Sequence, residues 1–332
     1  MKKRRMRLWA AMSLLVAALV LSAIDAPAEE KNEPPAVTSS TAFKLGGYTQ
    51  ILYTAQDSDF DGFTLHRARL SLSGELLKNI RYKLQVDALK SPILLDALVE
   101  FAFYEAATLR IGQFKVPFSQ ESLTSAGDLE TINRSQPVSK MSPGQDIGAA
   151  GRDIGAMVYG RVGIIEYSLG VFNGGGINKA DTNGEKDWAG RLVVHPASFL
   201  TIGASLYDGL SSPTQNGAPV KRDRAGLEMA VLYKALSLKG EFIKAADDET
   251  LKQGGYFQAG YFFLPKKIQG VFKVDFFDED MKADLDRSRL WTLGLNWFLA
   301  EKTKLMINFE LNKDGSGKTA NKAFLVQFQT GF

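Results

Sequence analysis

Apolar and polar residues alternate at every second position along most of this chain of 332 residues. In the last nine residues, one parity carries Phe324, Val326, Phe328, Thr330 and Phe332, and the other carries Leu325, Gln327, Gln329 and Gly331. This period places the two sets on opposite faces of a β-strand. An aromatic face opposite a small or polar face is typical of a barrel strand with lipid outside and water inside. Taken alone, this segment also fits the buried last strand of a soluble protein.

Sixteen such segments follow one another between residues 43 and 332, and apolar residues at helical spacing are scarce by comparison. The second segment is expected to present Leu70 and Leu72 to lipid. The fourth is expected to present Leu95, Ala97 and Val99 in the same way. The pattern therefore predicts a meander of sixteen strands with one apolar face.

The connections between these segments alternate in length. Tight turns, such as residues 234–235 and 265–267, take turns with longer polar loops, such as residues 117–151 after the fifth segment. Short turns on one rim and long loops on the other are the arrangement of a membrane barrel, and a β-sandwich gives no reason for it. The sequence thus predicts an all-β fold, a transmembrane antiparallel β-barrel of about 16 strands.

The N-terminus has the pattern of an export signal. Five basic residues within positions 2–7 precede an uncharged apolar run at 8–24, and Ala26-Pro27-Ala28 follows as a cleavage site. The run is short for a transmembrane anchor, which is the alternative. We expect residues 1–28 to be a removed signal peptide, residues 29–41 a short periplasmic leader, and residues 42–332 the barrel, with residues 117–151 as its long third loop.

Composition argues against several other functions. Removing residues 1–28, with their five basic residues and Asp25, changes the net charge from +3 to −1, so no concentrated basic surface for nucleic acid remains. The chain has no cysteine, and its two histidines, His66 and His195, show no metal-ligand or catalytic spacing. We therefore expect no enzyme activity, no cofactor, no metal and no nucleic-acid partner.

Several motifs together resemble the phosphate-selective porin O and P family. They are residues 64–74 (TLHRARLSLSG), the Gly-Gln-Phe-Lys-Val-Pro-Phe run at 112–118, and residues 151–157 (GRDIGAM). The resemblance implies a sixteen-stranded, usually trimeric channel in the outer membrane of a Gram-negative bacterium, with a third loop folded into the lumen. Phe332 resembles the C-terminal assembly signal of such barrels. The partners expected are outer-membrane lipid, the barrel-assembly machinery, two further copies of the chain, and small ions and hydrophilic solutes.

Solute preference should depend on the charged residues that alternation turns inward. The expected pore-lining bases are Arg67, Arg69, Arg81, Lys83, Arg110, Arg191 and Arg224, and the expected acids are Asp87, Asp96 and Glu100. The expected constriction loop carries Lys115, Glu121, Asp128, Glu130, Arg134, Lys140 and Asp146. A basic wall facing an acidic loop would set a transverse field and let small ions of both signs pass.

This interpretation predicts a water-filled porin for passive diffusion of small hydrophilic solutes and ions. Two alternatives remain open for the same arginines. They could form a path for oxyanions in an anion- or phosphate-selective porin, or they could only pair with wall carboxylates. A structural or adhesive outer-membrane barrel without a channel is a further alternative.

Overall fold

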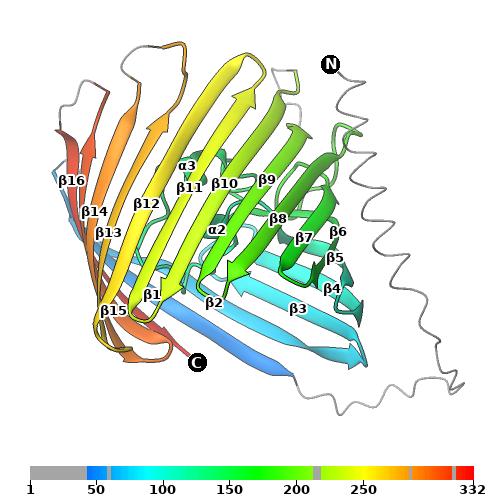
Figure 1. Cartoon of the computed structure of the whole chain (residues 1–332), viewed down its shortest axis with the longest axis horizontal. Helices are drawn as coiled ribbons and strands as arrows, with labels where there is room; N and C mark the ends of the chain where they lie inside the picture. Colours follow the sequence, from blue (N-terminus) through cyan, green and yellow to red (C-terminus); the bar gives the residue numbers. More distant parts are fainter. Residues whose placement is uncertain (1–42, 58–60, 212–217, 284–285, 316–318) are drawn as a thin grey trace, which may run out of the picture.

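The structure is a computed structural model that describes residues 43–57, 61–211, 218–283, 286–315 and 319–332. The expected signal peptide (1–28) and leader (29–41) lie outside the described residues. The described chain forms a closed barrel in which each strand pairs with its sequence neighbours and β1 pairs with β16 (Figure 1). The prediction of a sixteen-stranded antiparallel barrel is confirmed.

The strands have the following bounds: β1 Lys44–Gln56, β2 Gly62–Leu77, β3 Ile80–Asp87, β4 Leu94–Tyr104, β5 Ala107–Lys115, β6 Arg152–Val162, β7 Ile165–Phe172, β8 Asp187–Ala197, β9 Leu200–Leu210, β10 Lys221–Tyr233, β11 Leu236–Asp247, β12 Thr250–Leu264, β13 Ile268–Asp278, β14 Ser288–Ala300, β15 Thr303–Lys313 and β16 Thr319–Gly331. Two short helices, α2 (Gln120–Leu123) and α3 (Gln136–Met141), lie in the connection between β5 and β6. No helix in the described part of the chain is long and apolar enough to cross a membrane.

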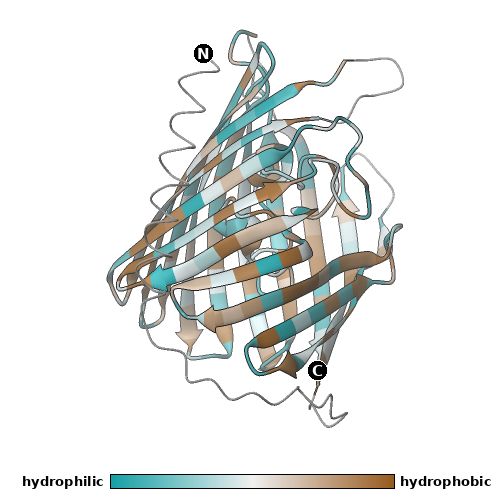
Figure 2. Cartoon of the chain, turned by 90° about the vertical axis from the view of Figure 1, so that its right-hand side faces the viewer, coloured by the Kyte–Doolittle hydropathy of each residue, from teal (hydrophilic) through white to brown (hydrophobic). Residues whose placement is uncertain are grey.

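The outer face of the barrel is apolar, as the alternation predicts. Side chains at one parity, such as Leu70, Leu293 and Phe328, are exposed, whereas inward neighbours such as Gln327 and Gln329 are buried. Figure 2 shows the resulting alternation of hydrophilic and hydrophobic residues along the strands. Exposed leucine and phenylalanine on a closed wall of strands fit a surface that meets hydrocarbon.

Leu95 is the exception, and the prediction that it faces lipid is wrong. The register between β3 and β4 shifts between Gln85 and Val86, because Gln85 pairs with Asp96 and Val86 pairs with Leu94. Leu95 is the extra residue at this irregularity, and its side chain is fully buried against Ala149 and Ile177. A β-bulge of this kind changes the side that a residue faces, which strict alternation cannot foresee.

Part of the barrel interior is a packed core rather than water. Residues 116–151, which connect β5 to β6, fold inside the ring of strands with α2 and α3 (Figures 1 and 2). Phe118, Val138 and Met141 from this loop are buried with Phe114 of β5 and Phe277 of β13. Burial of these side chains holds the loop against the inner wall and confines the open lumen to the remaining space.

Candidate functional site

The third loop is fixed to the inner wall by polar side chains from consecutive strands. Main-chain groups of residues 126–133 bond to Gln50 of β1 (to Ala126 O, 3.4 Å), Gln329 of β16 (to Gly127 O, 3.2 Å), Lys304 of β15 (to Leu129 O, 2.8 Å), Asn296 of β14 (to Glu130 O, 2.8 Å), Asn308 of β15 (from Ile132 N, 2.8 Å) and Lys273 of β13 (to Asn133 O, 2.8 Å). The loop therefore crosses the lumen and lies along the inner face of β13 to β16 and β1. Because these contacts satisfy main-chain groups inside the barrel, they fix the path of the loop.

Two acids of the loop, Glu130 and Glu121, are bound by hydrogen-bond donors of the barrel or of the loop itself. Glu130 accepts hydrogen bonds from Ser237 Oγ (2.9 Å), Lys239 Nζ (3.0 Å) and Gln258 Nε2 (2.7 Å). Glu121 is buried and accepts from the main-chain N and Oγ of Ser135. Carboxylates that are taken out of water need such partners, which explains their orientation.

Asp146 is held in the same way at the other end of the loop. Its carboxylate forms ion pairs with Arg222 and Arg224 of β10. Arg224 also donates to the carbonyl oxygen of Met141 (2.9 Å). The expectation of an acidic loop facing a basic wall across the channel is thus wrong for Glu121, Glu130 and Asp146. Ser135 of the loop binds Glu121, and side chains of β10 to β12 bind the other two.

Asp128 and Lys140 are exposed. Asp128 lines a space of about 350 Å³ near the short turn between β14 and β15, together with Glu130, Glu301, Lys302 and Lys304. This space carries charges of both signs in nearly equal number. Asp128 is therefore the loop acid that keeps the position expected for a residue acting on passing ions.

A larger open space of about 860 Å³ lies against the wall formed by β1 to β7. Its cationic lining residues are Lys44, Arg69, Arg81, Lys83, Arg110, Lys115 and Arg152, and its carboxylate lining residues are Glu75, Asp96 and Glu100. Cations also outnumber acids when Asp87, which lies 3.0 Å from Arg69, is added. The described open lumen is therefore positive on this side.

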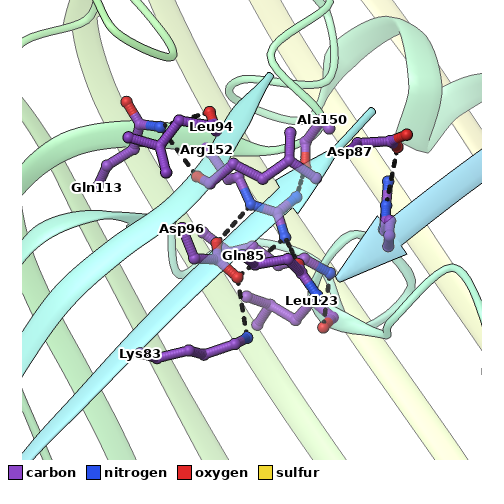
Figure 3. Close-up of polar contacts among 12 residues, drawn as sticks. Lys83, Gln85, Asp87, Leu94, Asp96, Gln113, Leu123, Ala150 and Arg152 are labelled. Carbon is purple, nitrogen blue, oxygen red and sulfur yellow. Dashed lines mark hydrogen bonds and ion pairs between the residues drawn. The ribbon is translucent and has the colours of Figure 1, made fainter. Parts of the chain in front are cut away.

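Two carboxylates of β4 are each shared by two cations. The Glu100 carboxylate lies 3.2 Å from Arg81 Nη2, accepts from Arg110 Nε (2.8 Å) and also accepts from Tyr159 Oη (2.7 Å). Asp96 lies 2.8 Å from Lys83 Nζ and pairs with Arg152. Lys83 and Arg152 converge on Asp96 from opposite sides (Figure 3). Each group of two cations and one carboxylate carries a net charge of +1.

Each of these two groups has one cation that is well exposed to the lumen. The side chains of Arg81 and Lys83, both on β3, are 45% and 42% exposed, whereas that of Arg152 is 3% exposed. Because Arg81 and Lys83 are two residues apart on one strand, their Cα atoms are about 7 Å apart. An anion that moves along β3 would therefore meet two exposed positive groups in succession.

The remaining predicted bases point inward but lie outside this space. Arg67 donates to Gln50 Oε1 (2.7 Å), at the seam between β1 and β16. Arg191 pairs with Glu228, and Arg224 is buried beneath the loop. Their inward parity agrees with the prediction, but their contacts are those of packed wall residues.

Lys115 and Arg134 hold the start of the loop from the inside. Lys115 Nζ donates to the carbonyl oxygens of Ser122 (2.8 Å), Leu123 (2.9 Å) and Thr124 (2.8 Å), at the C-terminal end of α2. Arg134 donates to Thr124 O as well (2.7 Å). Burial lowers the pKa of the Arg134 guanidinium. Both side chains donate to main-chain oxygens here, which fixes the start of the loop.

Sequence reasoning missed three charged lining residues, Arg152, Lys44 and Glu75. Arg152 lies in the run 151–157 that carries the family resemblance. It shares its parity with the apolar residues Ile154 and Ala156, so strict alternation places it on the outer face. In the structure both Arg152 and Asp153 are buried, because the end of the third loop covers this part of the wall. Among the residues described, no group of three or more His, Asp or Glu side chains could hold a metal ion.

Comparison with known proteins agrees with this architecture. The family model for phosphate-selective porin O and P matches residues 43–222 and 213–330. An uncharacterized protein of Aquifex aeolicus is 25% identical over 249 residues, which cover 61% of this chain and 58% of that protein. The chain thus spans less than two thirds of the length of this curated relative.

Solved outer-membrane proteins share the fold. OmpT of Vibrio cholerae, in its trimer form, has a TM-score of 0.66 at 10% identity, over 89% of this chain and 100% of that one. The outer membrane channel DcaP of Acinetobacter baumannii has a TM-score of 0.61 at 11% identity, over 87% and 97% of the two chains. Fold and family together define an outer-membrane porin of a Gram-negative bacterium. The chain belongs to the phosphate-selective porin O and P family.

Proposed function

We propose that this porin is a passive channel with a preference for anions. The observation that carries the proposal is the unequal lining of the 860 Å³ space, where seven cationic side chains meet three carboxylates. Three of the loop acids that would offset this charge are bound elsewhere: Glu130 and Asp146 by the wall beneath the loop, and Glu121 by Ser135 of the loop. A positive lining concentrates anions in the lumen and repels cations.

The same geometry supports diffusion more than tight capture of phosphate. Conduction needs sites that bind solutes weakly enough to release them. Glu100 and Asp96 already occupy part of the hydrogen-bonding capacity of Arg81, Arg110, Lys83 and Arg152. A passing oxyanion therefore competes with a fixed carboxylate at each step, which keeps its binding weak.

Further features belong to the same proposal. A homotrimer is supported by the trimer form of Vibrio cholerae OmpT, which shares the fold. Export through a signal peptide at 1–28, a leader at 29–41 and insertion by the barrel-assembly machinery are supported by the sequence pattern at the two ends of the chain. Family and fold favour a channel over an enzyme, and the proposal includes no cofactor.

The reversal potential of the purified protein in a planar bilayer tests the proposal. In a KCl gradient we expect chloride to be more permeant than potassium. Phosphate added at low concentration should reduce the chloride current only slightly. Strong block by low phosphate would favour a dedicated phosphate filter, and the absence of any conductance would favour a structural barrel.

A further inference from the structure

The wall of the open lumen has an apolar residue between its two positive groups. The inward residues of β4 are Asp96, Leu98 and Glu100 in succession, and Leu98 lines the 860 Å³ space. Lys83 of β3 pairs with Leu98 on one side, and Gly112 of β5 pairs with it on the other. Because Gly112 has no side chain, Leu98 is the apolar side chain on β4 between Asp96 and Glu100, with Lys83 beside it on β3.

Leu98 is part of a larger apolar floor. It packs, together with Tyr159 of β6, against the core that contains Phe114 and Met157, and all four residues line the open space. The Tyr159 ring also lies beneath the Arg110 guanidinium, 4.6 Å from the ring centroid. The floor thus rests on packed apolar side chains and has the Arg110 guanidinium at its border.

The positive groups at the two ends of this floor are separated along the strand. Asp96 and Glu100 are four residues apart, so their Cα atoms are about 13 Å apart. Lys83 reaches the Asp96 end, and Arg81 reaches the Glu100 end. An inorganic anion can use either end but gains nothing from the apolar surface between them.

We propose that this wall is a site for organic dianions whose two carboxylates are joined by an apolar spacer. One carboxylate would bind at Arg81 and Arg110, and the other at Lys83, while the spacer would lie on Leu98 and the edge of Tyr159. Guanidinium and ammonium groups suit carboxylates at the ends, and burial of methylene groups adds affinity in the middle. The inference rests on the proposed anion preference and specifies the solutes that benefit from it most.

Three carboxylic acids separate the contributions to this site. Suberate has two carboxylates and a long apolar spacer, succinate has two carboxylates and a short spacer, and hexanoate has one carboxylate and an apolar chain. Each is added at the same ionic strength to single channels in a planar bilayer, and the concentration that halves the chloride current is measured. We expect suberate to act at a concentration about fivefold lower than either of the others, because partial burial of its extra methylenes adds to two charge contacts.

Substitutions of Leu98 test whether the floor is responsible. Leu98→Asn keeps a similar size but adds a polar amide, and it should bring suberate and succinate to within about twofold of one another. Leu98→Met keeps an apolar side chain of similar volume and should retain the difference. The reversal potential in a KCl gradient is recorded for every variant. The block of the chloride current by suberate and succinate is then compared between channels of known anion preference.

The outcomes distinguish this inference from the proposed function. A channel that prefers chloride but is blocked equally by suberate and succinate would overturn only the dianion site. The same holds if Leu98→Asn keeps the full difference. A wild-type channel that prefers potassium would overturn the proposed anion preference itself, and the dianion site with it.

Discussion

Single carboxylates set the charge of this lumen, because each one decides how many cations remain uncompensated. Glu100 is shared by Arg81 and Arg110, so the three side chains together carry one positive charge. Glu100→Gln keeps an oxygen acceptor at this position but removes the negative charge. A unit charge about 7 Å from a passing ion contributes about 0.6 kcal/mol in water, roughly a threefold effect.

For Glu100→Gln we therefore expect the permeability ratio of chloride to potassium to rise about sevenfold, because the lost charge had opposite effects on the two ions. The measurement is the reversal potential in a KCl gradient. The amount of the protein in the outer membrane serves as a check on assembly. A ratio equal to that of the wild type would show that passing ions do not approach this pair.

Glu130 and Asp128 differ in role although both are loop acids. Glu130→Ala would leave Ser237, Lys239 and Gln258 without the acceptor that they share. Unsatisfied buried groups of this kind cost about 1–3 kcal/mol, so we expect a lower unfolding midpoint in guanidinium chloride and noisier single-channel currents. Asp128→Asn, at an exposed site, is the matched control. It should leave the midpoint unchanged and shift the reversal potential toward anions; equal midpoints for the two variants would contradict the assignment.

At this scale the sequence predicts the parity of most side chains but not their partners. Inward positions of Arg81, Lys83 and Glu100 follow from alternation, and the structure agrees. The pairing of Glu130 with the wall does not follow, because it depends on where a loop more than a hundred residues away in sequence lies against β11 and β12. Leu95 was mispredicted because a bulge shifts the register locally.

The last strand closes the barrel, and Phe332 takes part in that closure through its main chain. Phe332 N donates to Gly47 O (3.1 Å), Gly47 N donates to Phe332 O (3.3 Å), and Lys302 Nζ donates to Phe332 O (2.9 Å). The Phe332 side chain is 63% exposed. Main-chain contacts and side chain can therefore be tested separately.

Deletion of Phe332 and Phe332→Ala should behave differently in refolding. In cells we expect both variants to lower the amount of heat-modifiable barrel, because both remove the C-terminal aromatic residue that is the expected assembly signal. In detergent refolding of purified protein, only the deletion should lower the yield, since Phe332→Ala keeps the main-chain bonds to Gly47. Normal levels of both variants in the outer membrane would contradict the role of this terminus.

Elements as a whole were predictable because each barrel strand carries its own signal. A strand that separates lipid from water must alternate, and each tight turn must reverse the chain within a few residues. The third loop has no such local constraint. Its helices are only four and six residues long, and its position comes from contacts with the inner wall, so the sequence could indicate its length and charge but not its path.

For the whole molecule, the loop divides the barrel into a packed part and an open part. Most of the loop acids are bound by other side chains in the packed part. In the open part, cations outnumber carboxylates along β3 to β6. This distribution changes the expected selectivity from a balanced transverse field to a positive lumen. The net charge of the chain without the expected signal peptide is near zero and does not reveal this distribution, because selectivity depends on which charges remain in contact with water.

The most direct test compares the wild type with the double variant Arg81→Gln, Lys83→Gln. Arg81 and Lys83 are the more exposed cations beside Glu100 and Asp96, and their loss reduces the lining, counted with Asp87, from seven cations against four carboxylates to five against four. Arg110 and Arg152 still pair with the two carboxylates in the double variant. In a planar bilayer with a KCl gradient, we predict a reversal potential that favours chloride for the wild type and one near zero or favouring potassium for the double variant. A wild type that favours potassium, or a double variant with the reversal potential of the wild type, would contradict the positive lumen.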